Sequence, residues 1–474
     1  MKKLLLLAIT ALAFAGGRAV TVDPTLYKEY DGIKVQNLWL LDRVHCPKDF
    51  AADADLSSNN YARRAILRNG IAYVALSNAG NVVVAPGDTV KEVGRIMRYD
   101  ARTGKKLASL ELTLNGRPYG GLLCANNIGV DNYGHFWIMP FTQSARYVPF
   151  YQLNENTGEL KLLAELDKGA KIARTDYCDV IGDITLKEDV CNIISPGASS
   201  NLVYGWHNDK GGDSDTWSGF FFGEPSLAIL HCYPEAEEVN FSYAPAAKFI
   251  LGEDDDTRYA GDLFYIDGFG LWPTIYDFEG NIVEDFGVAK ADIEANPKLA
   301  GDPGANGITE FWLEDHHFIA YPQGQYEKGF KCEMNIVELG EGDSFAGMDL
   351  KWYFPQTGLG STSDTGIRLH EVSVEEVTEG GQPAIMMLDY KCFNGMGVYL
   401  LGKGVTPTGS DEPIEPEIPG DLNGDEQVNA GDVSELYTLI LAGNFDEKAD
   451  LNNDNQVNAG DVSELYGIIL GGGK

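Results

Sequence analysis

The end of the chain carries one short sequence written twice, and this repeat limits what that region can fold into. The segment QVNAGDVSELY starts at Gln427 and returns unchanged at Gln456, 29 residues later. Each copy belongs to a longer stretch rich in acids and amides, DLNGDEQVNAGD from Asp421 and DLNNDNQVNAGD from Asp450. Side-chain oxygens fall at positions 1, 3, 5, 9 and 12 of each stretch, and a backbone carbonyl is available at position 7. This spacing suits a hard cation such as calcium, which takes about six to eight oxygen ligands.

An amphipathic helix is predicted after each loop. Apolar side chains recur there at i, i+3, i+4 and i+7, the spacing that lines one face of a helix. They are Val433, Leu436, Tyr437 and Ile440 in the first copy, and Val462, Leu465, Tyr466 and Ile469 in the second. One loop and helix are too short to bury a core alone. We therefore expect the two copies to pack face to face, with metal binding contributing to folding.

The duplicated D-x-N-x-D-x-x-V-N-x-x-D loop with its following helix resembles a dockerin, the calcium-dependent module that tethers secreted enzymes to cohesin domains. The resemblance covers about residues 420–472. It implies an all-α, EF-hand-like module with two Ca²⁺ sites and a cohesin-like partner on a scaffold or surface protein. The ligands that it implies in the first loop are Asp421, Asn423, Asp425, Gln427 through its backbone, Asn429 and Asp432. In the second loop they are Asp450, Asn452, Asp454, Gln456 through its backbone, Asn458 and Asp461.

Two features of the repeat depart from the dockerin pattern. Loop position 6, which is usually glycine, is Glu426 in the first copy and Asn455 in the second. Asn tolerates a left-handed backbone better than Glu does, so we expect the first site to be the weaker one. The positions where dockerins carry partner-recognition side chains hold the small pairs 430–431 and 459–460, both Ala-Gly. The alternative is therefore a calcium-stabilised structural cap that binds no partner.

Charge and the N-terminal segment bear on the compartment of the protein. The formal net charge of −35 argues against nucleic-acid binding, because phosphate contacts need a basic face. Residues 1–19 are predicted to be a signal peptide, with Lys2 and Lys3, an apolar run from Leu4 and an A-x-A sequence at Ala13. No later stretch reaches the ~20 apolar residues needed for a transmembrane span. We therefore expect a secreted protein, whether extracellular, cell-surface-associated or periplasmic.

Residues 22–403 are predicted to form a β-propeller, which makes the fold class mainly β. Short apolar strands such as Ile71–Leu76 are followed by a recurring turn phrase, as in YDARTGKKL, LNENTGEL and YDFEGNIV. The intervals between these phrases indicate a repeat of about 60 residues, typical of blades built from antiparallel hairpins. The region resembles secreted bacterial β-propellers, with about six blades. Seven blades are the alternative, and an open pair of β-sandwiches is the rival fold. Residues 35–40 are expected to pair with residues 397–401 and close the ring.

The seven cysteines are scattered through this region without C-x-x-C spacing, which argues against zinc. Cys178 and Cys191 are close enough in sequence to bridge a hairpin, but we favour buried free thiols for most of the seven. Residues 404–419 are rich in proline and acids and are predicted to be an extended linker before the module at residues 420–474.

The large domain lacks the familiar catalytic sequence patterns, so its catalytic residues are unknown at this level. His316 and His317 would face opposite sides of a strand and are interpreted as turn and surface residues. The rings of Trp206, Trp217 and residues 220–222 either bind sugar or pin a long loop. The favoured function is docking of a glycan- or protein-binding propeller into an extracellular polysaccharide-processing assembly. The alternative is that the propeller is itself a glycoside hydrolase or polysaccharide lyase.

Overall fold

The computed structural model describes residues 29–58, 62–169, 172–208, 218–219, 229–231, 241, 245–250, 263–268, 271–286, 307–323, 333–355, 358–360, 370–407, 420, 422, 428–442, 449, 451–452 and 456–470. The chain divides into two compact units, Met1–Thr408 and Gly409–Lys474. Within the described residues, no helix is both long and apolar enough to cross a bilayer. The signal-peptide segment, Cys232, Cys332, Trp217 and the rings at 220–222 lie outside the described residues.

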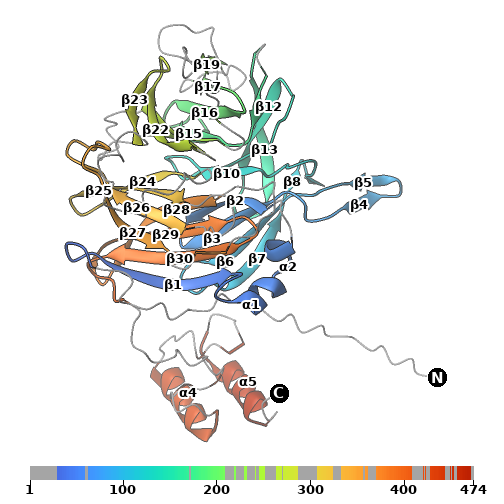
Figure 1. The fold of residues 1–474 in the computed structure, drawn as a ribbon. Helices are drawn as coiled ribbons and strands as arrows, with labels where there is room; N and C mark the ends of the chain where they lie inside the picture. The colour runs from blue at the N-terminus through green and yellow to red at the C-terminus, as the bar shows by residue number, and fades with distance from the viewer. Residues whose placement is uncertain are drawn as a thin grey trace. The chain divides into compact units, whose positions relative to one another are not determined.

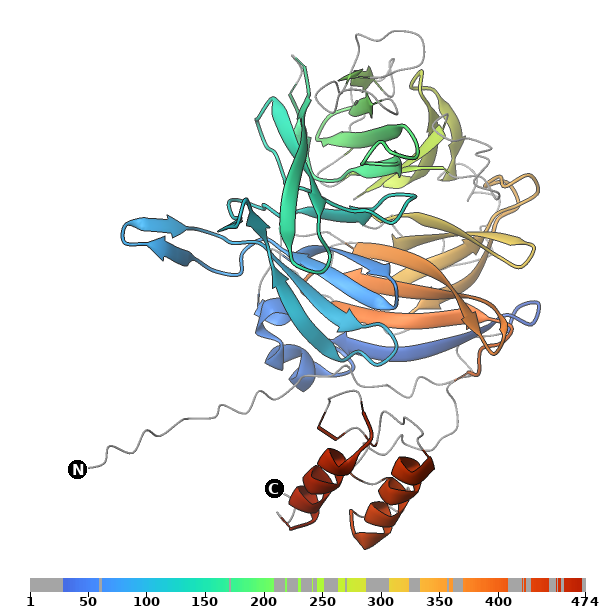
Figure 2. The ribbon, with the colours of Figure 1, turned by 180° about the vertical axis from the view of Figure 1, so that it is seen from behind.

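The first unit is a six-bladed β-propeller, as the turn phrases predicted (Figures 1 and 2). Each blade is an antiparallel meander whose first strand is innermost. The first blade consists of β2 (Ala62–Arg68), β3 (Ile71–Leu76), β6 (Arg95–Asp100) and β7 (Lys106–Glu111). The second consists of β10 (Asn127–Val130), β11 (Phe136–Met139), β12 (Tyr147–Leu153) and β13 (Glu159–Asp167). The third consists of β15 (Asp179–Gly182), β16 (Cys191–Ala198) and β17 (Leu202–Asn208), with β14 (Arg174–Thr175), β18 (Ser218–Gly219) and β19 (Ile229–His231) at its edges.

The remaining three blades repeat the pattern. The fourth consists of β20 (Ala246–Phe249), β21 (Leu263–Gly268), β22 (Leu271–Asp277) and β23 (Ile282–Asp285). The fifth consists of β24 (Thr309–Leu313), β25 (His316–Gln323), β26 (Glu333–Glu338) and β27 (Asp349–Phe354). The sixth consists of β28 (His370–Glu379), β29 (Gln382–Lys391), β30 (Gly395–Gly402) and β1 (Lys34–Asp42).

Short elements decorate the ring. Two helices, α1 (Pro47–Ala52) and α2 (Ala54–Ser58), follow β1 and pack on the core between the sixth and first blades. A hairpin of β4 (Val82–Ala85) and β5 (Asp88–Val90) projects away from the first blade (Figure 2). A second hairpin, β8 (Thr113–Leu114) and β9 (Arg117–Pro118), extends the outer edge of the second blade by pairing with β13.

The ring closes through the first strand of the domain, as predicted. Strand β1 pairs antiparallel with β30, with Val35 opposite Leu401 and Leu40 opposite Gly397. The sixth blade thus joins residues from both ends of the domain. A separate apolar cluster fills the space between each pair of neighbouring blades, including the sixth and the first. This unbroken circle of cores rules out the open sandwich pair.

The recurring turn phrases join the third strand of a blade to its outermost strand. In the first blade, the Asp100 carboxylate accepts hydrogen bonds from the N–H groups of Arg102 and Thr103. Asn154 plays the same part in the second blade and Asp277 in the fourth. The glycines of these turns, at 104, 158 and 280, all have positive φ, which explains why glycine recurs there.

Each of the five cysteines in the described part of the chain is a buried free thiol. They are Cys46, Cys124, Cys178, Cys191 and Cys392. In the β15–β16 pair, Gly182 lies opposite Cys191, whereas Cys178 precedes β15 at the other end of the ladder. The alternative of a disulfide between Cys178 and Cys191 is therefore wrong, because the two residues are not cross-strand partners.

The second unit contains the two predicted helices, α4 (Ala430–Ala442) and α5 (Ala459–Leu470). Their shared core buries Val433, Leu436, Val462 and Leu465, with Ile440 and Ile469 partly buried against it. The two tyrosines of the predicted stripe are not buried with the other residues, since Tyr437 is 48% exposed and Tyr466 is 46% exposed. Each tyrosine follows a buried leucine by one residue, about 100° further around the helix, and so reaches the edge of the buried face.

Candidate calcium loops and central channel

The structure describes six of the twelve predicted calcium ligands. Asn429 and Asp432 represent the first loop, and Asn452, Gln456, Asn458 and Asp461 the second. The other six, Asp421, Asn423, Asp425, Gln427, Asp450 and Asp454, lie outside the described residues.

The two position-12 carboxylates occupy equivalent buried places. The side chains of Asp432 and Asp461 lie in the first turns of α4 and α5, and both residues are fully buried. Asp432 accepts hydrogen bonds from the N–H of Leu422 (2.8 Å) and of Asn429 (2.7 Å). Asp461 accepts from the N–H of Asn452 (3.2 Å) and of Asn458 (2.8 Å). A helix N-terminus favours negative charge, so both carboxylates lie where they could help to hold a cation.

The position-9 asparagines cap the two helices. The Oδ1 atom of Asn429 accepts a hydrogen bond from the Gly431 N–H, and that of Asn458 accepts from the Gly460 N–H, each at 2.7 Å. A Cβ atom at residue 460 would come within 2.6 Å of the Asn452 amide nitrogen. The small Ala-Gly pair in the second copy therefore has a packing reason. The side-chain oxygens that the described residues offer as metal ligands belong to carboxylates and amides, which fits calcium.

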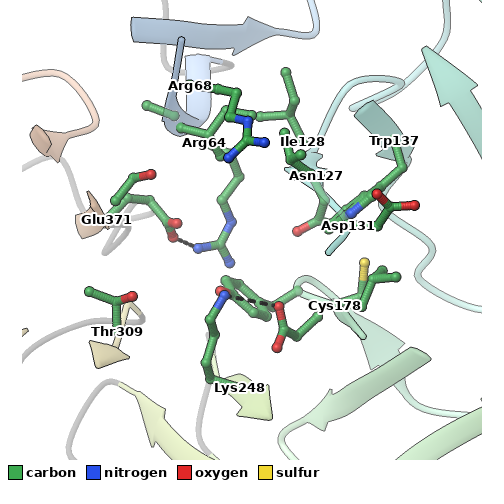
Figure 3. A pocket seen from close by; sticks show the side chains of 18 of the residues that line it. Arg64, Arg68, Asn127, Ile128, Asp131, Trp137, Cys178, Lys248, Thr309 and Glu371 are labelled. Atoms are coloured by element: carbon green, nitrogen blue, oxygen red, sulfur yellow. Dashed lines mark hydrogen bonds and ion pairs between the residues drawn. The ribbon is translucent and has the colours of Figure 1, made fainter. Parts of the chain in front are cut away.

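A cavity of about 340 Å³ lies in the central channel of the propeller (Figure 3). Residues from the innermost strand of every blade line it, namely β2, β10, β15, β20, β24 and β28 or the residues just before them. Because each blade is a meander that starts at the channel, the innermost strands all run in one direction. Their first residues therefore collect at one end of the channel, which we call the N-terminal mouth.

Arg64, the third residue of β2, is the central cation of this mouth. Its guanidinium forms an ion pair with Glu371 of β28 (Figure 3). It also lies over the ring of Tyr177, 4.1 Å from the centroid. The side chains of Arg64 and Glu371 are 2% and 9% exposed. Burial lowers the pKa of Arg64 to about 10. Burying the charge of Arg64 therefore costs desolvation free energy, and the ion pair with Glu371 offsets part of it.

A second ion pair, between Lys248 and Asp179, lines the same cavity. The Nζ atom of Lys248, which is labelled in Figure 3, lies 3.1 Å from Oδ1 of Asp179. The Phe249 N–H donates to Oδ2 of the same carboxylate at 2.8 Å. The Lys248 side chain is 31% exposed, so water reaches this side of the cavity.

Further charges surround the pairs. Arg174 pairs with Asp176 at 2.6 Å, and Arg63 lies 3.8 Å from the same carboxylate. On β21, burial raises the pKa of Asp267 to about 8, although the Gly307 backbone and the charge of Arg64 act in the opposite direction. Asp267 is therefore a protonated acid at neutral pH, within electrostatic reach of Arg64.

Sequence reasoning missed this channel. Arg64 and Glu371 are 307 residues apart and meet because the ring closes. The available signal was the pair Arg63–Arg64 in the otherwise apolar segment YARRAIL, since a strand buried on both faces rarely holds an unpaired cation.

The carboxylates of Asp131 and Asp183 meet His135 beside the channel, and ligand atoms of the three lie close enough to hold a metal. Backbone groups already occupy these oxygens. Asp131 accepts from the N–H of Tyr133, His135 and Ile184, and Asp183 accepts from the N–H of Thr185, Lys187 and Glu188. We interpret the cluster as a tie between the second and third blades.

Two further expectations can be compared with the structure. His316 and His317 do face opposite ways: His316 pairs with Glu338 at 2.5 Å, and His317 with Asp343 at 2.9 Å. His317 is 7% exposed, so its interpretation as a surface residue is wrong. Trp206 is 1% exposed and its indole N–H donates to the Asp167 carbonyl, so it pins the third blade.

Comparison with known proteins adds a family for the second unit. Residues 419–470 match the family model of the dockerin type I domain. No curated protein matches the chain.

Among solved structures, the chain is similar to a DUF4623 family protein from Bacteroides eggerthii, at 9% identity and TM-score 0.48, over 80% of this chain and 76% of that one. It is similar to the WD40 domain of coronin from Toxoplasma gondii, at 11% identity and TM-score 0.36, over 81% and 89%. It is also similar to an α-L-arabinofuranosidase from Fusarium graminearum, at 8% identity and TM-score 0.37, over 73% and 96%.

Proposed function

Starting from a dockerin type I domain joined to a six-bladed propeller, we propose that this is a secreted protein of an extracellular polysaccharide-processing assembly. Its C-terminal module binds two Ca²⁺ ions and docks onto a cohesin-like domain of a scaffold or surface protein, while the propeller binds a glycan. The observation that carries the docking role is the equivalent placing of Asp432 and Asp461, both buried at a helix start within the segment that matches the family model.

Exposed apolar side chains supply a docking face on the module. Tyr437 is 48% and Leu441 87% exposed on α4, and the matching residues of α5, Tyr466 and Leu470, are 46% and 82% exposed. Such side chains gathered on a small module are typical of a protein-binding surface. These four residues are called the docking residues below. Calcium would act indirectly, by fixing the helices that carry them.

The docking role is tested with the full chain and a panel of purified cohesin domains. We expect binding of at least one cohesin in Ca²⁺ and its loss in EGTA. Serine at all four docking residues should weaken that binding at least tenfold while Ca²⁺ uptake continues. The matched control is Val83→Ser on the propeller hairpin, where the native side chain is 70% exposed. Ca²⁺ uptake without binding to any cohesin would instead support the structural cap.

The channel supports the glycan-binding role. The cavity volume lies at the lower end of ligand pockets, which are about 300–1,000 Å³. Tyr177 and Trp137 add aromatic rings to a lining that also carries polar groups, a combination that suits sugars. Each acid of the lining is already held: Glu371 by Arg64, Asp179 by Lys248, and Asp131 by backbone N–H groups. Carboxylates so engaged are poor bases or nucleophiles, which favours binding over hydrolysis.

One observation favours the second candidate, a glycoside hydrolase or polysaccharide lyase. Asp267, with its pKa raised to about 8, has the protonation state of a general acid at neutral pH. The test is turnover of a panel of plant and microbial polysaccharides by the native chain. An enzyme should lose at least a hundredfold in kcat on Asp267→Asn, whereas a binding protein shows no turnover to lose.

A further inference from the structure

We infer that the ligand of the channel carries a carboxylate group, and that Arg64 binds this group in a hexuronic acid or an oligosaccharide that contains one. This inference rests on the proposed glycan-binding role and names its ligand class.

The first support is a set of buried donors without acceptors around the cavity. Arg64 turns Nη1 toward Glu371, while its Nε and Nη2 atoms have no hydrogen-bond partner. The indole Nε1 of Trp137, on another side of the same cavity, also has none (Figure 3). Buried donors are nearly always satisfied in folded proteins, so three around one cavity call for a ligand or solvent rich in oxygen.

The second support is the geometry of the unpaired donors. The Nε–H and one Nη2–H of an arginine point the same way and form one side of its planar fork. That side matches the two oxygens of a carboxylate, which it can bind through two parallel hydrogen bonds. A single sugar hydroxyl or a carbonyl would fill one of the two positions. The free side of Arg64 therefore favours a carboxylate over a neutral sugar group.

The third support is a gathering of cations in a chain whose net charge is −35. Arg63, Arg64, Arg174 and Lys248 each lie beside a carboxylate of Asp176, Asp179 or Glu371, and Arg68 also lines the cavity. The nearby acid Asp267 keeps its proton at neutral pH because burial raises its pKa. An anionic ligand would therefore meet several cations here, in a protein that is acidic as a whole.

Size and access agree with this ligand. The cavity of about 340 Å³ has room for a small sugar, and the partly exposed Lys248 marks a side that solvent reaches. With its carboxylate on Arg64, a sugar ring would lie beside Tyr177, whose own face already carries the guanidinium.

The test is calorimetry on the calcium-loaded full chain with D-galacturonate, D-glucuronate, their methyl esters, the neutral parent sugars and a sulfated sugar, together with short oligomers of each. We expect saturable 1:1 binding of a uronate, and at least tenfold weaker binding of its methyl ester, because the ester keeps the ring and removes the charge. Both are measured on the native protein, so this comparison needs no variant.

The matching variant is Arg64→Gln/Glu371→Gln, which removes both charges and leaves no lone buried ion. It should bind the uronate at least tenfold more weakly than the native chain. The control is Arg117→Gln/Asp88→Asn, which removes an exposed pair of the same type, 2.5 Å apart, and should bind as the native chain does. If the channel variant does not fold, the ester comparison decides alone.

Each other outcome overturns the inference in a different way. Equal binding of uronate and ester would show that the carboxylate is not recognised. Tighter binding of the sulfated sugar would assign the site to sulfate. Binding of neutral sugars without uronates would leave the proposed glycan-binding role intact and refute the carboxylate. Binding of no sugar at all would refute both, and water would then satisfy the buried donors.

Discussion

The ion pair between Arg64 and Glu371 gives the sharpest prediction about the propeller. Glu371→Gln leaves a guanidinium whose side chain is 2% exposed without its counter-ion, and Arg64→Gln leaves a carboxylate that is 9% exposed. Removing one partner of such a buried pair costs about 3–5 kcal/mol of stability. That loss is large against the ~5–15 kcal/mol that holds a typical domain together.

The double variant Arg64→Gln/Glu371→Gln should be much more stable than the sum of the two single losses suggests. With both charges gone, no uncompensated ion remains, so the coupling in a double-mutant cycle should reach about 2 kcal/mol or more. Urea denaturation, followed by tryptophan fluorescence at pH 7, measures all four proteins. The burial argument fails if the single variants have the same urea midpoint as the native protein. It also fails if the coupling energy is below ~0.5 kcal/mol.

Three further predictions concern the calcium loops, the ring closure and the buried acid Asp267. Calorimetry on the full chain should give two Ca²⁺ per native protein and one after Asp432→Ala or Asp461→Ala; a native count of zero or one would contradict the paired sites. Gly395→Ala should lower the free energy of unfolding by about 1–3 kcal/mol, because Gly395 has φ +122 and a Cβ there would meet the backbone of β1. The control is Gly87→Ala, where φ is +81 and the space is open, so that only the backbone strain is measured. Because the folded-state pKa of Asp267 is raised from 3.8 to about 8, its contribution to stability is present below pH ~4 and declines as the pH rises through 8. Asp267→Asn should flatten that decline in urea titrations at pH 5 to 8, and an unchanged slope would place the effect elsewhere.

Local signals in the sequence predicted most of the framework. The turn phrases, in which an Asp or Asn precedes a Gly by three or four residues, depend on hydrogen bonds between residues close in sequence. Asp100 and Asn154 could therefore be interpreted without knowing the fold. The closing strand was also predictable, because residues 35–40 form an apolar strand at the start of a domain that ends in another one. The helices of the repeat followed from spacing, and the two tyrosines were misplaced because spacing alone does not define where a buried face ends.

The channel could not be predicted in the same way. Its residues come from six strands spread between Arg64 and Val374, and each blade contributes a few of them. Composition marks Arg64 as unusual, but its partner depends on which strands become neighbours across the ring. The burial of His317 depends instead on packing within the fifth blade. Its partners are Glu310, on the strand before it, and Asp343, in the loop after the next strand.

The way in which β1 covers β30 has a mechanical consequence if the protein is held by its tail, as the proposed docking role implies. The tail continues from β30, and β30 is flanked by β29 on one side and β1 on the other. A load pulled through the tail would therefore enter a strand gripped along both edges, with Gly402 registered against Lys34 on one side and Ala384 on the other. Extracting that strand requires two ladders to shear together, whereas a strand at a blade margin could be peeled off one hydrogen bond at a time.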